Sequence, residues 1–144
     1  MATMSNLAAI AALDDAIALL IVGATLSAPT IRTYDGTAPA RVDVALSGNT
    51  VLAENLMSAT PFAGATDDSG NNRAKAVANA ITDDSSANAT TATGATFARI
   101  FSKGDVAIFQ ISVAESGAEG TINSDKIQIG TVVSYSSLFL ALPE

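Results

Sequence analysis

Three pairs of adjacent aspartates are the residues of this chain best suited to chemistry: Asp14-Asp15, Asp67-Asp68 and Asp83-Asp84. Paired carboxylates can act as general acid and base, or hold calcium through hard oxygen ligands. The run Asp-Asp-Ser-Gly-Asn-Asn at 67–72 places several oxygens in one turn, but it lacks the spacing and the distal glutamate of an EF-hand. We therefore interpret the second and third pairs as parts of solvated loops, and predict no metal site and no cofactor.

Histidine and cysteine are both missing from the sequence. The chain therefore lacks the commonest general base near neutral pH, the thiolate nucleophile and the preferred zinc ligands. Catalytic arrangements of the Ser-His-Asp or Cys-His kind are excluded as well. We predict that the protein is not an enzyme and holds no transition metal.

The charge balance bears on the kind of partner. Asp and Glu number 14 against 7 Lys and Arg, which gives a net charge of -7. A nucleic-acid binder needs a basic surface for the phosphates, and an anionic membrane attracts basic segments, so we predict neither partner. Residues 7–26 are mostly apolar, but Asp14 and Asp15 lie among them and no basic residue precedes Arg32. The sequence thus predicts neither a signal peptide nor a membrane span.

An amphipathic helix is predicted over residues 5–22, with Ser5 as N-cap and Gly23 at its end. Its apolar residues recur at steps of three and four, which places them on one stripe. The stripe can pack on the core of its own domain, or the segment 1–28 can act as an arm laid on a partner. If the second holds, the helical interface residues are Leu7, Ile10, Leu13, Ile17 and Leu20.

Beyond Pro29 the hydrophobic period changes from helical to alternating, which indicates about seven or eight short strands. Turn residues recur between them and no helical stretch separates them. This pattern favours a mainly β fold, an antiparallel β-sandwich or jelly roll with one N-terminal helix. We predict a β-sandwich domain over 29–144. The expected strands cover 30–34, 50–57, 74–81, 94–101, 105–113, 121–129 and 131–142.

Phe97, Arg99 and Phe101 alternate along one predicted strand and therefore share a face. If that face is buried, the Arg99 guanidinium needs a carboxylate partner. If it is exposed, the two aromatic rings and the arginine form a contact patch of the kind found in protein interfaces. Both interpretations stay open at the level of the sequence.

Five segments, in this order, give the chain a resemblance to a known family. They are 11–20 (AALDDAIALL), 30–40 (TIRTYDGTAPA), 78–87 (ANAITDDSSA), 94–100 (GATFARI) and 127–134 (IQIGTVVS). Together they resemble small structural proteins of tailed bacteriophages, the capsid cement or decoration proteins. The resemblance extends over about residues 11–140, and its motifs are structural rather than catalytic.

The resemblance implies a β-rich virion protein on the outer capsid surface, assembled in the host cytoplasm. Its partners would be the major capsid protein and further copies of itself, as a dimer or trimer. It would stabilise the shell by bridging subunits, and it supplies no catalytic residue. An alternative function is that of a structural module of a phage tail or fibre, which binds a host surface.

Overall fold

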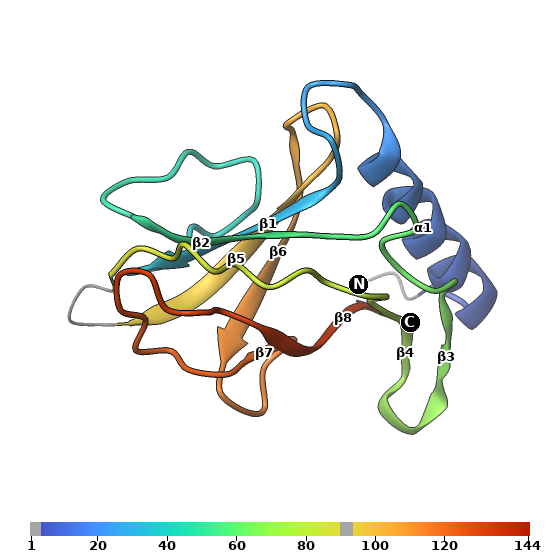
Figure 1. The fold of residues 1–144 in the computed structure, drawn as a ribbon. Helices are drawn as coiled ribbons and strands as arrows, with labels where there is room; N and C mark the ends of the chain where they lie inside the picture. The colour runs from blue at the N-terminus through green and yellow to red at the C-terminus, as the bar shows by residue number, and fades with distance from the viewer. Residues whose placement is uncertain (1–3, 90–93) are drawn as a thin grey trace.

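The computed structural model describes residues 4–89 and 94–144, and shows a mainly β protein with one N-terminal helix (Figure 1). The helix α1 (Asn6–Ala18) runs into a short 3-10 helix, η1 (Leu19–Ile21). The strands are β1 (Thr30–Asp35), β2 (Val51–Leu56), β3 (Thr66–Asp68), β4 (Arg73–Val77), β5 (Ala95–Phe101), β6 (Ala107–Ala114), β7 (Gly120–Ile122) and β8 (Tyr135–Pro143), with a 3-10 turn, η2 (Ser69–Asn71), between β3 and β4.

The eight strands form one sheet in the order β2-β1-β5-β6-β7-β8-β4-β3. All neighbours are antiparallel except β6 and β7, which pair in parallel at Val113 with Gly120 and at Ala114 with Thr121. The tight connection 115–119 returns the chain to a position beside the end of β6, so that β7 runs in the same direction as β6. The sheet is therefore mixed and open, and the predicted division into an antiparallel sandwich or jelly roll is not confirmed.

An irregular segment, 78–88, lies between β2 and the residues that lead into β8. The Thr82 amide donates to the Leu56 carbonyl at 2.8 Å. Asp84 and Val133 exchange two backbone hydrogen bonds, at 3.0 and 2.7 Å. Although 78–88 is not a regular strand, it satisfies backbone groups on both sides and holds the sheet in a strongly curved shape.

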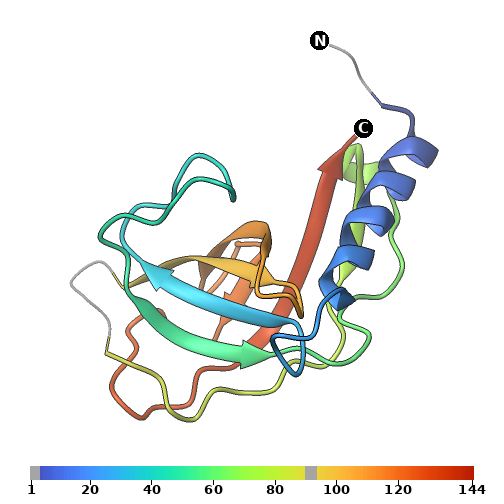
Figure 2. The same ribbon diagram turned by 90° about the horizontal axis from the view of Figure 1, so that it is seen from above.

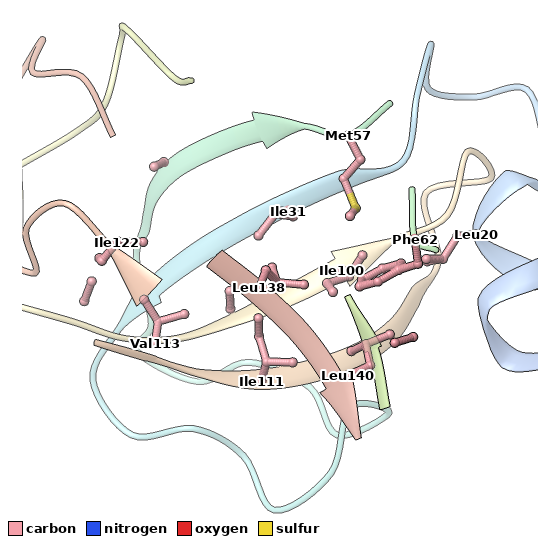
Figure 3. Packing of buried hydrophobic residues seen from close by; sticks show 14 of the residues in the cluster. Leu20, Ile31, Met57, Phe62, Ile100, Ile111, Val113, Ile122, Leu138 and Leu140 are labelled. Atoms are coloured by element: carbon pink, nitrogen blue, oxygen red, sulfur yellow. The ribbon is translucent and has the colours of Figure 1, made fainter. Parts of the chain in front are cut away.

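The curved sheet encloses a core of small and medium-sized apolar side chains. Ile31, Ile100 and Leu138 come from β1, β5 and β8 and meet inside it (Figure 3). The hydroxyl groups of Thr33 on β1 and Tyr135 on β8 are 2.7 Å apart, which joins two strands that are distant in the sheet order. The interior is thus closed by contacts across the sheet as well as along it.

Helix α1 begins as predicted: the Ser5 side chain accepts a hydrogen bond from the Ala8 amide. The helix packs against β4 and β8, close to the C-terminal end of the chain (Figure 2). Leu13 and Leu20 are buried in the core, and Ile10 and Ile17 pack against it. The helix therefore lies on its own domain. Residues 1–3 of the predicted arm 1–28 lie outside the described residues.

Four of the five residues of the predicted helical interface are buried or pack against the core: Ile10, Leu13, Ile17 and Leu20. Leu20 is fully buried and Leu13 is 4% exposed, because the stripe that could have met a partner packs on the core of its own domain. Leu7 is the exception: its residue is 81% exposed, since it lies on the first turn of α1, beyond the stripe that reaches the core.

Two adjacent leucines of η1, directly after α1, provide a test of this packing. Leu20 is fully buried, whereas Leu19 is 50% exposed. Leu20→Ala should lower the free energy of unfolding by about 2–5 kcal/mol, because it removes core contacts and leaves a cavity. Leu19→Ala should cost less than about 1 kcal/mol. Urea denaturation measures both, and equal losses would contradict the buried position of the helix end.

The two tyrosines, in a chain without tryptophan, offer a second test. Burial raises the pKa of Tyr34 despite the opposing charges of Arg32 and Arg99, and burial raises the pKa of Tyr135 far above its ordinary value. The unfolded chain releases these protons near pH 10, while the folded chain releases them at higher pH. The free energy of unfolding should therefore fall as pH rises above about 10.

Ultraviolet absorbance of the phenolate and circular dichroism, followed together during an alkaline titration, check this expectation. Both tyrosines should ionise at a higher pH in the folded protein than in the unfolded chain. A full phenolate signal near pH 10 from a protein with native circular dichroism would contradict the burial of Tyr34 and the shielding of the Tyr135 hydroxyl by Thr33.

Candidate interaction surfaces

Two of the three acidic pairs hold backbone segments together. An oxygen of Asp14 on α1 accepts a hydrogen bond from the Ala65 amide at 2.8 Å, which fastens the helix to the segment before β3. An oxygen of Asp84 accepts from the Glu54 amide at 2.8 Å, which fastens 78–88 to β2. These carboxylates therefore stabilise the fold, rather than converging on a substrate.

Asp68, of the remaining pair, ends β3 at a turn where a solvated loop was expected. Its carboxylate accepts from the Arg73 guanidinium at 2.6 Å and from the Asn71 amide group. The hydrogen bond from Arg73 holds the pKa of Asp68 below its ordinary value. Among residues 4–89 and 94–144, no three or more acidic side chains gather where a metal ion could bind.

The predicted face of Phe97, Arg99 and Phe101 exists, but most of it is covered. Phe97 is buried and stacks on Tyr34 of the neighbouring strand, with ring centroids 5.2 Å apart. Arg99 is only 5% exposed. The long connection 36–50 between β1 and β2, which we call the cover loop, lies over this side of the sheet. Phe97 and Arg99 are thus internal and unavailable to a partner.

Burial led us to expect a carboxylate partner for Arg99. Among the described residues, its hydrogen-bond acceptors are instead an amide side chain and two backbone carbonyls. Its Nε donates to Gln110 Oε1 at 3.0 Å, and its Nη2 donates to the carbonyls of Val44 at 2.6 Å and Arg41 at 3.4 Å. Gln110 donates in turn to the Pro39 carbonyl at 2.6 Å. One guanidinium and one amide therefore fasten the middle of the cover loop to β5 and β6.

Phe101 remains half-buried beneath a second arginine. The Arg32 guanidinium lies 4.3 Å from the centre of the Phe101 ring, and pairs with Glu54 at 2.7 Å and Asp105 at 2.8 Å. Burial lowers the pKa of Arg32, but its bonds to the two carboxylates outweigh that effect and raise the pKa. Of the predicted strand patch, only Phe101 reaches the surface, and its ring is shared with Arg32.

A different apolar surface forms where η1 meets the hairpin between β5 and β6. The Lys103 amide donates to the Leu20 carbonyl and the Gly104 amide to the Val22 carbonyl, both at 2.9 Å. This approach requires Gly23, which has a φ of 106° and whose added Cβ would stand 2.3 Å from the Gly104 Cα. The junction is therefore closely fitted along its backbone.

Around this junction lie four exposed aliphatic side chains, which we call the apolar end: Leu19 (50%), Ile21 (52%), Val22 (60%) and Val106 (58%). Next to it, a shallow groove of about 150 Å³ runs from Ile17 and Ile21 to Pro61 and Phe62. Exposed apolar side chains that gather on one surface of a protein often mark an interaction site. The apolar end is the best candidate for an interaction surface on this molecule.

Sequence reasoning missed the apolar end, although the sequence contains a signal for it. The run 16–22 is apolar at every position, so it also supplies residues off the buried stripe. A helix that only covers a core needs apolar residues on one side. Leu19, Ile21 and Val22 exceed that requirement, and this excess is the signal for an exposed apolar surface.

Comparison of the chain with models of protein families, with curated proteins and with solved structures found no match. No helix in the described part of the chain has both the length and the hydropathy needed to cross a bilayer.

The fastening of the cover loop by Arg99 can be tested by proteolysis. Arg99→Ala should let trypsin cleave after the exposed Arg41 about 10- to 100-fold faster, because hydrogen bonds from a charged group contribute about 1.5–3 kcal/mol. Arg73→Ala, which removes a guanidinium from the β3–β4 turn, is the matched control and should leave that cleavage rate unchanged. Equal rates in the two variants would show that other contacts hold the loop.

Proposed function

We propose that this protein is a structural component of a bacteriophage virion, a capsid cement or decoration protein. In this role it binds the outside of the major capsid shell and stabilises the shell by bridging its subunits. The resemblance in five segments of the sequence supports the proposal. The observation in the structure that favours it most is the apolar end, which exposes aliphatic side chains on a closely fitted junction.

A cement protein must bind the shell and needs no catalytic group. Each side chain of the apolar end is about half-exposed, so its burial in a partner contributes about 1 kcal/mol. One such contact is weak, but simultaneous contacts with several shell subunits raise the avidity by orders of magnitude. The curved sheet takes the place of the expected sandwich as the body that holds this surface in position.

The proposed contact is apolar, and this determines its response to salt. Charged residues make up only 15% of the chain, and the apolar end contributes none. Screening weakens exposed charge pairs, whereas burial of apolar surface persists in sodium chloride. Binding to the shell should therefore survive at about 0.5 M salt, where the Debye length is about 4 Å.

Heat resistance of shells with and without this protein tests the proposal. Shells stripped of it should break at a lower temperature, and adding the protein back should restore them, also at about 0.5 M sodium chloride. The double variant Ile21→Ser/Val22→Ser should fail to restore them. The double variant Ile129→Ser/Val132→Ser makes the same chemical changes at exposed positions elsewhere, and should restore them fully.

Each other result has a definite meaning. Equal breakage of stripped and decorated shells would exclude the cement function. A handful of copies per particle, instead of hundreds, would indicate the tail or fibre module. Loss of binding at the higher salt concentration would show an electrostatic contact, and equal failure of both double variants would move the contact away from the apolar end.

A further inference from the structure

The sheet has a gap between β6 and β8. Strand β7 lies between these two strands but has only three residues, Gly120–Ile122. It pairs with β6 only at Val113 and Ala114, and with β8 only between Tyr135 and Leu138. Among the described residues, the rest of β6 on this side and the end of β8 have no strand neighbour.

The backbone groups along both walls of the gap point into it. The Ser112 amide donates to the Glu119 side chain and the Phe139 amide to the Glu119 carbonyl, so both face the β7 side. The Leu138 carbonyl accepts from Ala78 on the opposite side of β8. Because backbone groups alternate along a strand, those of Gln110 and Ala141 also face the gap.

The gap is an apolar groove of about 250 Å³. Ile111 of β6 and Leu140 of β8 line its walls (Figure 3), and Leu13 and Ala16 of α1 line it from the helix side. Glu119 stands at the end next to β7. The groove therefore combines apolar walls with two open strand edges. Strand β7 lies at one end of the groove, between the same two strands.

We infer that this gap binds an extended segment of a different polypeptide, which adds a strand in line with β7. Only a peptide backbone offers alternating donors and acceptors to both walls at once. The segment runs in the direction of β7, parallel to β6 and antiparallel to β8, because β7 already fits between these strands in that direction. It lies opposite the three β8 residues 140–142 that line the groove, beyond Glu119, and directs apolar side chains toward α1.

A second copy of this chain is a poor donor of such a strand. Its described strands are all paired within the sheet. Segment 42–46 of the cover loop, where Val42, Val44 and Leu46 alternate, is held by Arg99 at Val44. The inference rests on the sheet edges and the groove, and does not depend on the capsid function.

A synthetic peptide, acetyl-Thr-Val-Thr-Val-Thr-Val-Thr-amide, is the probe for the full chain. Amide hydrogen exchange of Gln110 and Ala141, followed by NMR, should slow about tenfold at a peptide concentration ten times its Kd. A control peptide with proline at its third and fifth positions lacks two donors and should have no effect. No slowing with the first peptide, or equal slowing with both, would overturn the inference.

Two variants of α1 locate the site. Ala16→Phe fills the groove and should abolish the effect of the peptide, while Ala11→Phe places the same ring on an exposed position of the helix and should not. If Ala16→Phe does not fold, the comparison of the two peptides on the unaltered chain decides. Slow exchange of Gln110 and Ala141 that develops with protein concentration alone would show that a second copy is the occupant, and would overturn the assignment to a different polypeptide.

Discussion

The backbone of segment 78–88 is the constraint on which the rest of the structure depends. A sheet wrapped around a small core brings β2 close to the residues before β8, and buried amides and carbonyls at that meeting must find partners. The segment supplies them on both sides, and the buried amide group of Asn55 adds bonds to the carbonyls of Thr82 and Val133. These bonds join β2 to the residues before β8 and so keep the sheet wrapped around its core.

Local patterns predicted the parts of the fold that local interactions determine. The helix, its N-cap Ser5 and the strands β1, β2, β5 and β6 follow from periodicity and capping, and lie within a few residues of their predicted bounds. The expected strands 74–81 and 121–129 end early, because 78–88 and the residues after Ile122 bond to distant segments irregularly. Strand β3 is short and acidic, and its pairing with β4 is not visible in its own residues.

The site residues show the same division between local and distant information. Alternation correctly places Phe97, Arg99 and Phe101 on one face of a strand. It cannot reveal that the cover loop lies over that face, because the loop is held by carbonyl groups, which every residue has. Burial of a charge without a carboxylate is acceptable here, since three oxygens accept from the guanidinium at once.

The sheet is closed between β2 and β8 and open between β6 and β8. Between β2 and β8 the chain fills the space with its own irregular segment, and the backbone there is satisfied. Between β6 and β8 the tight return at 115–119 leaves β7 too short to fill the space. Because α1 covers this groove with alanine and leucine, apolar burial is available there to an added strand. The helix thus stabilises the core through its buried stripe, while its neighbouring residues shape the groove and the apolar end.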